Sequence, residues 1–333
     1  MDIGKSNGEI KLFTGNSNRP LAEKIAINLD QIAKTREDSS IKQKIKIGSA
    51  DVSRFKDGEI SLKIFEGIRE CDVFVIQSTS YPVNENIMEL LIMIDAMKRA
   101  SAKRITAVIP YYGYARQDRK VRARDPISAK LVANLITSAG ADRVLTMDLH
   151  SAQIQGFFDI PVDNLTAMPI FSSYYLDKFD NIDDIIVVSP DLGSVARGRA
   201  LADRLDVNLA IVDKRRSETV DDVSEVGHVI GNVAGKRVIL IDDEIDTGGS
   251  IANAANALKD HGAKEIYVCC THGKFSGGAL QKIEESPIKE LLSLDTIQLQ
   301  KESDKITTLS VDKIFADAIF RIHEGISVST LFN

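Results

Sequence analysis

The chain has 333 residues, a length that suits two domains of ordinary size better than a single core. It carries 42 basic and 48 acidic residues, and this net charge of −6 argues against a nucleic-acid partner, because such proteins usually have a basic excess. The N-terminus lacks an apolar secretory segment, and no apolar run approaches the ~20 residues of a membrane span. We therefore expect a cytoplasmic protein with no membrane partner.

Short apolar runs recur along the chain and predict strands that are buried on both faces of a sheet. They cover residues 11–15, 44–48, 72–78, 104–110, 143–148, 185–190, 209–213, 237–242 and 265–270. Helical patterns lie between many of these runs, and they are clearest at 86–100, 128–139 and 250–260. Strands that alternate with helices predict an α/β fold with mostly parallel sheets flanked by helices.

A weak internal repeat indicates two domains of similar topology. Gly140-Ala141 precedes one predicted strand and His150 follows it, while Gly262-Ala263 and His272 stand in the same order around another. We place the N-terminal domain at 1–165 and the C-terminal domain at 166–323. The last segment, 324–333, is a candidate for packing against the first domain.

The most specific motif is VILIDDEIDTGGS, at residues 238–250. Asp242 and Asp243 come at the end of a buried strand, where open α/β sheets bind ligands. The turn that follows consists of Asp246, Thr247, Gly248, Gly249 and Ser250. Its glycines admit a ligand close to the backbone, and its N–H groups and the next helix N-terminus favour a phosphate. The carboxylates suit sugar hydroxyls, or a Mg²⁺ ion that bridges to the sugar.

This motif resembles the phosphoribosyl diphosphate-binding motif of phosphoribosyltransferases and ribose-phosphate diphosphokinases. Residues 12–332 as a whole resemble a class I ribose-phosphate diphosphokinase. The specific segments include RFKDGEI (54–60), YYGYARQDRK (111–120), SPDLG (189–193), DKRR (213–216) and RIHEGISVSTLF (321–332). The resemblance implies two domains of phosphoribosyltransferase-like topology. It also implies transfer of the β,γ-diphosphoryl group of Mg-ATP to the 1-hydroxyl of ribose 5-phosphate, which gives phosphoribosyl diphosphate and AMP.

The resemblance assigns two segments to ATP. In one, Phe55 can stack on adenine, while Asp57 and Glu59, around Gly58, can accept from its exocyclic amine. The family's matching loop reaches into a neighbouring subunit's site. In the other segment, the assigned residues are Arg116 and Gln117, whose side chains can bind a phosphate and an adenine or ribose edge.

The resemblance also assigns the metal and the catalytic cations. His150 and Asp191 form the metal-site pair at the ATP phosphates. His150 either ligates the ion directly or, because Mg²⁺ prefers oxygen ligands, acts through a metal-bound water or on a phosphate. Lys214 and Arg216 are catalytic and open a polar loop, 214–226, that suits a lid. Arg216 also contacts the sugar phosphate or the triphosphate. The turn at 246–250, with Asp242 and Asp243, binds ribose 5-phosphate.

Regulation and assembly follow from the resemblance alone. Class I members bind an activating phosphate, with ADP as competitor, at subunit contacts, and the matching residues here are Ser327, Ser329 and Phe332. The family forms hexamers built from dimers. Three features depart from the family pattern: an acidic and longer lid segment, Glu244 in place of an apolar residue, and Gly273-Lys274 where a proline is usual.

Two other functions share parts of this pattern. A phosphoribosyltransferase would carry the turn at 246–250 but would not need the segments RQDRK and FKDGE. A non-catalytic regulatory homologue would have lost residues of the lid or of the ATP site. The lid and ATP-site residues Lys214, Arg216, His150, Asp191, Arg116 and Gln117 are all present, which favours the diphosphokinase.

Overall fold

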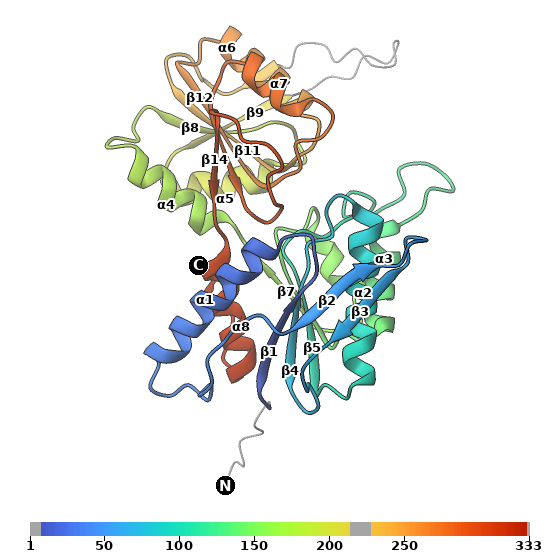
Figure 1. Ribbon diagram of the computed structural model, residues 1–333. Coiled ribbons are helices and arrows are strands. Elements are labelled where there is room, and N and C mark those ends of the chain that lie inside the picture. Colours follow the sequence, from blue (N-terminus) through green and yellow to red (C-terminus); the bar gives the residue numbers. More distant parts are fainter. Residues whose placement is uncertain (1–7, 214–227, 332–333) are drawn as a thin grey trace. The chain divides into compact units, whose positions relative to one another are not determined.

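The computed structural model describes residues 8–213 and 228–331, and the chain divides into two compact units (Figure 1). Unit 1 comprises Met1–Thr166, Thr296–Gln298 and Ser310–Asn333, and unit 2 comprises Ala167–Asp295 and Leu299–Leu309. Residues 310–323, which the sequence analysis assigns to the second domain, lie in unit 1. None of the described helices is long and apolar enough to cross a membrane.

Unit 1 is built on a five-stranded parallel sheet with the strand order β1-β4-β5-β6-β7. These strands are β1 (Ile10–Thr14), β4 (Asp72–Ile76), β5 (Arg104–Ile109), β6 (Arg143–Met147) and β7 (Val162–Leu165). A separate antiparallel hairpin joins β2 (Ala50–Arg54) to β3 (Ile60–Ile64). The helices are α1 (Arg19–Thr35), α2 (Val83–Arg99), α3 (Ser128–Ala139) and α8 (Asp312–Glu324), with short 3₁₀ turns η1 (Ala152–Phe157) and η2 (Ser329–Leu331).

Helices cover both faces of the unit 1 sheet (Figure 1). Val73 and Val75 of β4 join a core with α2 and α3, as expected for alternate residues of a buried strand. Helices α1 and α8 pack together on the other side. The apolar face of α8 is buried, including Phe315 and Ile319. This burial explains why the C-terminal helix folds with the N-terminal unit.

Unit 2 contains a seven-stranded sheet, with the order β10-β9-β8-β11-β12-β13-β14 among the described residues. The strands are β8 (Ile185–Ser189), β9 (Asn208–Asp213), β10 (His228–Ile230), β11 (Arg237–Ile245), β12 (Glu265–Gly273), β13 (Ile288–Leu294) and β14 (Ile306–Leu309). All pair in parallel except β10, which is antiparallel to β9. The helices are α4 (Met168–Lys178), α5 (Val195–Leu205), α6 (Gly249–Asp260) and α7 (Ala279–Glu285).

The repeat that the sequence indicates appears as one helix–turn–strand unit in each half. Helix α3 ends at Gly140, with a φ of +117°, before β6, and α6 ends before Gly262, with a φ of +83°, which leads to β12. Both turns need positive φ, which glycine adopts without steric cost. The segment after β5 in unit 1 therefore corresponds to the segment after β11 in unit 2.

One predicted strand is wrong. Residues 44–48 form only an isolated bridge, between Ile47 and Leu12. The N–H of Ile45 donates to Oδ1 of Asp30 at 2.9 Å, so it bonds to a helix side chain rather than to a neighbouring strand. Ile41 and Ile45 are nevertheless buried, which explains the apolar pattern.

Candidate active site

Strand β11 extends further along one neighbouring strand than along the other at the carboxyl edge of the unit 2 sheet. It pairs with β8 only as far as Leu240, but it continues beside β12 to Ile245. The strand is therefore longer than the predicted run, and Asp242 and Asp243 lie within it. Because parallel strands end at the same edge, the segments that follow β8 and β11 lie close together there.

Asp242 and Asp243 form an acidic pair that the neighbouring helix partly neutralises. Nη1 of Arg197, in α5, lies 3.8 Å from Oδ1 of Asp242 and 3.5 Å from Oδ1 of Asp243. Burial, reinforced by the negative charge of Asp243, raises the pKa of Asp242 to about 7. A cation would compensate the negative charge of the pair, and a sugar hydroxyl would donate a hydrogen bond to its carboxylates. Either would therefore bind favourably here.

Ser194 links this pair to the predicted metal ligand Asp191. The Ser194 backbone N–H donates to Oδ1 of Asp191 at 3.0 Å, and its hydroxyl donates to Oδ1 of Asp242 at 2.9 Å. Ser194 is buried, and it precedes the first residue of α5. Ser194 thus holds Asp191 and Asp242 in one hydrogen-bonded group.

The turn from Asp246 to Ser250 joins β11 to α6 and presents its backbone. Gly248 has a φ of +73°, and a Cβ there would lie 3.2 Å from the carbonyl oxygen of Ala279. A Cβ at Gly249 would instead meet no atom of the described residues within 4 Å, its own helix backbone aside. Helix α6 begins here without a capping side chain, and the positive end of its dipole favours an anion.

Unit 1 places three predicted residues at the carboxyl edge of its own sheet. Arg116 and Gln117 follow β5, His150 follows β6, and all three are exposed. Oε1 of Gln117 accepts a hydrogen bond from the hydroxyl of Ser128, the first residue of α3. The Gln117 carbonyl accepts from the N–H of Ala129 at 3.2 Å. These two bonds fix the segment against the start of α3.

The tip of the β2–β3 hairpin is ordered by its own hydrogen bonds. The N–H of Phe55 donates to the Glu59 carbonyl at 2.8 Å, and the N–H of Glu59 donates to Oδ1 of Asp57 at 3.1 Å. Gly58 has a φ of +96°, as this tight turn requires. The Phe55 side chain is 57% exposed, so its ring can stack on a base.

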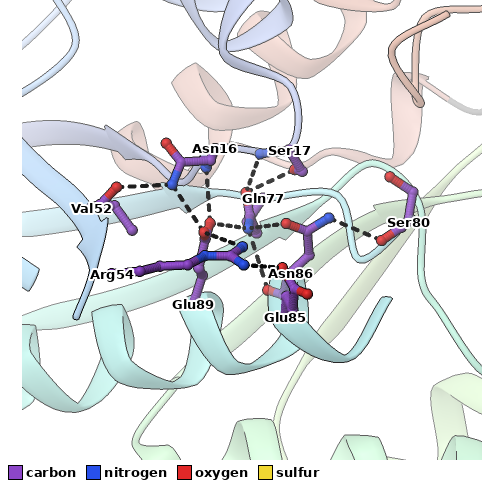
Figure 2. Close-up of polar contacts among 9 residues, drawn as sticks. All are labelled: Asn16, Ser17, Val52, Arg54, Gln77, Ser80, Glu85, Asn86 and Glu89. Carbon is purple, nitrogen blue, oxygen red and sulfur yellow. Dashed lines mark hydrogen bonds and ion pairs between the residues drawn. The ribbon is translucent and has the colours of Figure 1, made fainter. Parts of the chain in front are cut away.

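A buried glutamate anchors this hairpin to the sheet (Figure 2). Glu89, in α2, is 1% exposed, and its carboxylate accepts from the N–H and Nδ2 of Asn16 and from Nε2 of Gln77, at 2.9–3.0 Å. Asn16 also donates from Nδ2 to the Val52 carbonyl in β2, at 3.0 Å. Nη2 of Arg54, the residue before Phe55, lies 3.9 Å from Oε1 of Glu89.

The chain matches proteins of one family along nearly its whole length. Residues 10–140 match the model for the N-terminal domain of ribose phosphate pyrophosphokinase, and residues 225–333 match the phosphoribosyl synthetase-associated domain. The chain is 58% identical over 327 residues to a ribose-phosphate pyrophosphokinase of Clostridium tetani, and the match covers 97% of each chain. The chain belongs to the ribose-phosphate pyrophosphokinase family.

Other comparisons agree with this family. A ribose-phosphate pyrophosphokinase of Caldanaerobacter subterraneus is 56% identical over 332 residues, which cover 99% of this chain and 100% of that one. The crystal structure of phosphoribosylpyrophosphate synthetase from Mycobacterium smegmatis covers 95% of this chain and 99% of its own, with 41% identity and a TM-score of 0.86. The predicted α/β fold of phosphoribosyltransferase-like topology is confirmed.

Lys214, Arg216, Phe332 and the lid segment 214–226 lie outside the described residues. His150 belongs to unit 1 and Asp191 to unit 2. Ser327 and Ser329 follow α8, and their hydroxyl oxygens lie 2.7 Å apart. Their roles stay predictions.

Sequence reasoning missed the residues that support this family's motifs. Arg197 and Ser194 were not singled out, although Ser194 directly follows the SPDLG segment and Arg197 lies in the first turn of the next helix, α5. The hairpin's anchor, Glu89, lies inside a helical pattern that is otherwise apolar. A carboxylate on an apolar helix face was the signal that could have identified it.

Proposed function

We propose that this chain is a ribose-phosphate diphosphokinase that uses Mg-ATP and ribose 5-phosphate. The hydroxyl oxygen at C1 of the sugar attacks the β-phosphorus of ATP, and the bond from that phosphorus to the α–β bridging oxygen breaks. AMP leaves with the electron pair, and the hydroxyl proton is released. Family membership at 58% identity over 97% of the chain carries the proposal.

The turn at 246–250 suits the 5-phosphate, because its glycines expose backbone beside the N-terminus of α6. Asp242 and Asp243 would accept hydrogen bonds from the ribose hydroxyls. On the ATP side, Phe55 would stack on the base, while Arg116 and Gln117 would bind the nucleotide. The reaction then depends on positioning and on charge stabilisation, as in other phosphoryl transfers.

The donor chemistry fits Mg²⁺. Asp191 offers carboxylate oxygen, which this ion prefers, and its Oδ1 is oriented by the Ser194 N–H at 3.0 Å. The ATP phosphates would supply further oxygens. His150 would act through water or on a phosphate. When bound, the ion neutralises and orients the phosphates.

Lys214 and Arg216 are proposed as the cations that neutralise the charge developing at the breaking α–β bridge. A group that acts mainly in the transition state affects kcat more than KM. Lys214→Ala should therefore lose about 10²–10³ in kcat with little change in either KM. A folded variant that keeps more than about a tenth of wild-type kcat would contradict this role.

The deciding experiment incubates the protein with Mg-ATP and ribose 5-phosphate and follows the nucleotide products. AMP should form in equal amount to phosphoribosyl diphosphate, with no free diphosphate. An ordinary kinase would release ADP. ADP as the sugar-dependent product would therefore refute the proposal.

We extend the proposal to the enzyme's location, assembly and regulation. The enzyme would act in the cytoplasm as a homo-oligomer, a hexamer built from dimers, with inorganic phosphate as activator and ADP as competitor. Ser327 and Ser329 would bind these anions together with Phe332, and Arg321 holds the segment through its 3.0 Å bond to the Ser327 carbonyl. Phosphate titration of the wild type and of Ser329→Ala tests this site. Equal phosphate dependence would remove Ser329 from it.

A further inference from the structure

Glu244 and Lys274 contact each other beside the turn at 246–250. Nζ of Lys274 donates to Oε1 of Glu244 at 3.0 Å and lies 3.6 Å from Oδ2 of Asp246. The side chains of Lys274 and Glu244 are 15% and 8% exposed. A partly buried ion pair therefore adjoins the first residue of the turn.

The backbone holds Lys274 in this place. Its N–H and that of Phe275 donate to the Ile245 carbonyl at 2.9 and 3.1 Å. The N–H of Ser276 donates to the Asp246 carbonyl at 2.9 Å, and its hydroxyl donates to Oδ1 of Asp246. Phe275 has a φ of +48°, a costly conformation that the surrounding bonds maintain. The segment from Lys274 to Ser276 thus forms a fixed backing for the turn.

The charges around the turn explain why a cation is needed. Four carboxylates lie within the strand and turn, at residues 242, 243, 244 and 246, where a sugar phosphate is expected to bind. Arg197 lies within 4 Å of the first two and Lys274 within 4 Å of the other two. Without Lys274, Glu244 and Asp246 would repel an incoming phosphate in a partly buried site, where screening is weak.

We propose that Lys274 is a positioning residue for ribose 5-phosphate. It neutralises Glu244 and orients the Asp246 carboxylate, so that the turn accepts the phosphate dianion. The inference rests on the proposed function, because it assigns the turn to the sugar phosphate. The Lys274 ammonium acts through Asp246 and makes no contact with the substrate in this account.

The test compares four variants by steady-state kinetics and thermal unfolding. Lys274→Leu removes the cation and leaves Glu244 buried without it, whereas Lys274→Arg keeps the charge. The double variant Glu244→Leu/Lys274→Leu removes both charges, so it separates the stability of the pair from its effect on the substrate. Lys289→Leu is the matched control, because Lys289 pairs with Glu265 at 2.5 Å at the other end of β12.

Lys274→Leu should raise KM for ribose 5-phosphate at least about ten-fold, equivalent to 1.4 kcal/mol, while KM for ATP stays within about two-fold. The double variant should unfold near the wild-type temperature and keep part of the raised KM, because it removes the Glu244 charge but still leaves Asp246 without the Lys274 cation, and Lys274→Arg should restore most of the affinity. A double variant with wild-type KM, or an equal rise in KM for ATP, would overturn the inference. Failure of the wild type to form AMP would instead refute the proposed function.

Discussion

Nδ1 of His323 lies 2.7 Å from Oδ2 of Asp72, although 251 residues separate them in the chain. Asp72 is completely buried at the start of β4. Its carboxylate also accepts from Nε and Nη2 of Arg104 at 2.8 and 2.5 Å, and Nη2 donates in turn to the Ile322 carbonyl at 3.0 Å. One carboxylate therefore connects two strands of the unit 1 sheet to the C-terminal helix.

Asp72→Asn should destabilise the protein strongly. The amide cannot balance the Arg104 guanidinium, and removing one partner of a buried charged group leaves the other uncompensated. The expected loss in free energy of unfolding is about 3–5 kcal/mol, measured by urea denaturation. Asp95→Asn provides the control, because Asp95 pairs with Arg99 at 2.7 Å on the exposed surface of α2. The control should unfold like the wild type, and equal losses in the two variants would contradict the role of burial.

The sequence predicted the parallel-sheet architecture and the turn at 246–250 between β11 and α6 because both depend on local signals. Apolar runs mark buried strands, and the helix over 128–139 was placed correctly by its periodicity. The docking of α8 on unit 1 could not be predicted, because its partners, such as Asp72, are remote in sequence. The contact between Glu244 and Lys274 was missed for the same reason, although each residue was noticed singly. The strand predicted at 44–48 was wrong because apolar side chains can be buried without forming a strand.

Glu89→Gln should weaken ATP binding more than ribose 5-phosphate binding. The carboxylate accepts from Asn16 and Gln77 in the buried network of Figure 2, and an amide at this position would turn an NH₂ group toward other donors. The expected destabilisation is about 1–3 kcal/mol, with a rise in KM for ATP as the Phe55 hairpin loses its anchor. Glu85→Gln is the matched control, because Glu85 also pairs with Arg54 but is far more exposed. If both variants keep wild-type KM for ATP, the hairpin does not depend on Glu89.

Asp242 should make stability fall as pH rises. Its pKa is raised to about 7 in the folded protein from the ordinary 3.8, so between these values the folded state binds the extra proton. Stability then decreases from pH 4 to pH 7 on account of this group. Asp242→Asn should remove this dependence and be more stable than the wild type at pH 8 by on the order of 4 kcal/mol, with little difference at pH 4. Thermal unfolding across this pH range measures it.

Asp184→Asn should change stability with pH in the opposite direction, so it serves as the control for the Asp242 experiment. Its side-chain hydrogen bond with Arg237 lowers the pKa of Asp184. A lowered carboxyl pKa stabilises the folded state above the ordinary value, and this stability is lost as pH falls. Asp184→Asn should therefore be less stable than the wild type near pH 7 and approach it at low pH. Parallel pH profiles for the two variants would contradict the raised pKa of Asp242.

Gly248→Val and Gly249→Val should separate the folding role of the turn at 246–250 from its proposed role in binding ribose 5-phosphate. Gly248 has a φ of +73° and lies against Ala279, so a side chain there is strained and should cost at least about 1–2 kcal/mol of unfolding free energy. Gly249 has ordinary φ and open space at its Cβ, so Gly249→Val should fold with nearly unchanged stability. Its branched side chain would occupy the space that the phosphate needs, and KM for ribose 5-phosphate should rise about 100-fold or more, equivalent to about 2.8 kcal/mol. KM for ATP should change far less. A stable Gly249→Val enzyme with wild-type KM for the sugar would place the phosphate elsewhere.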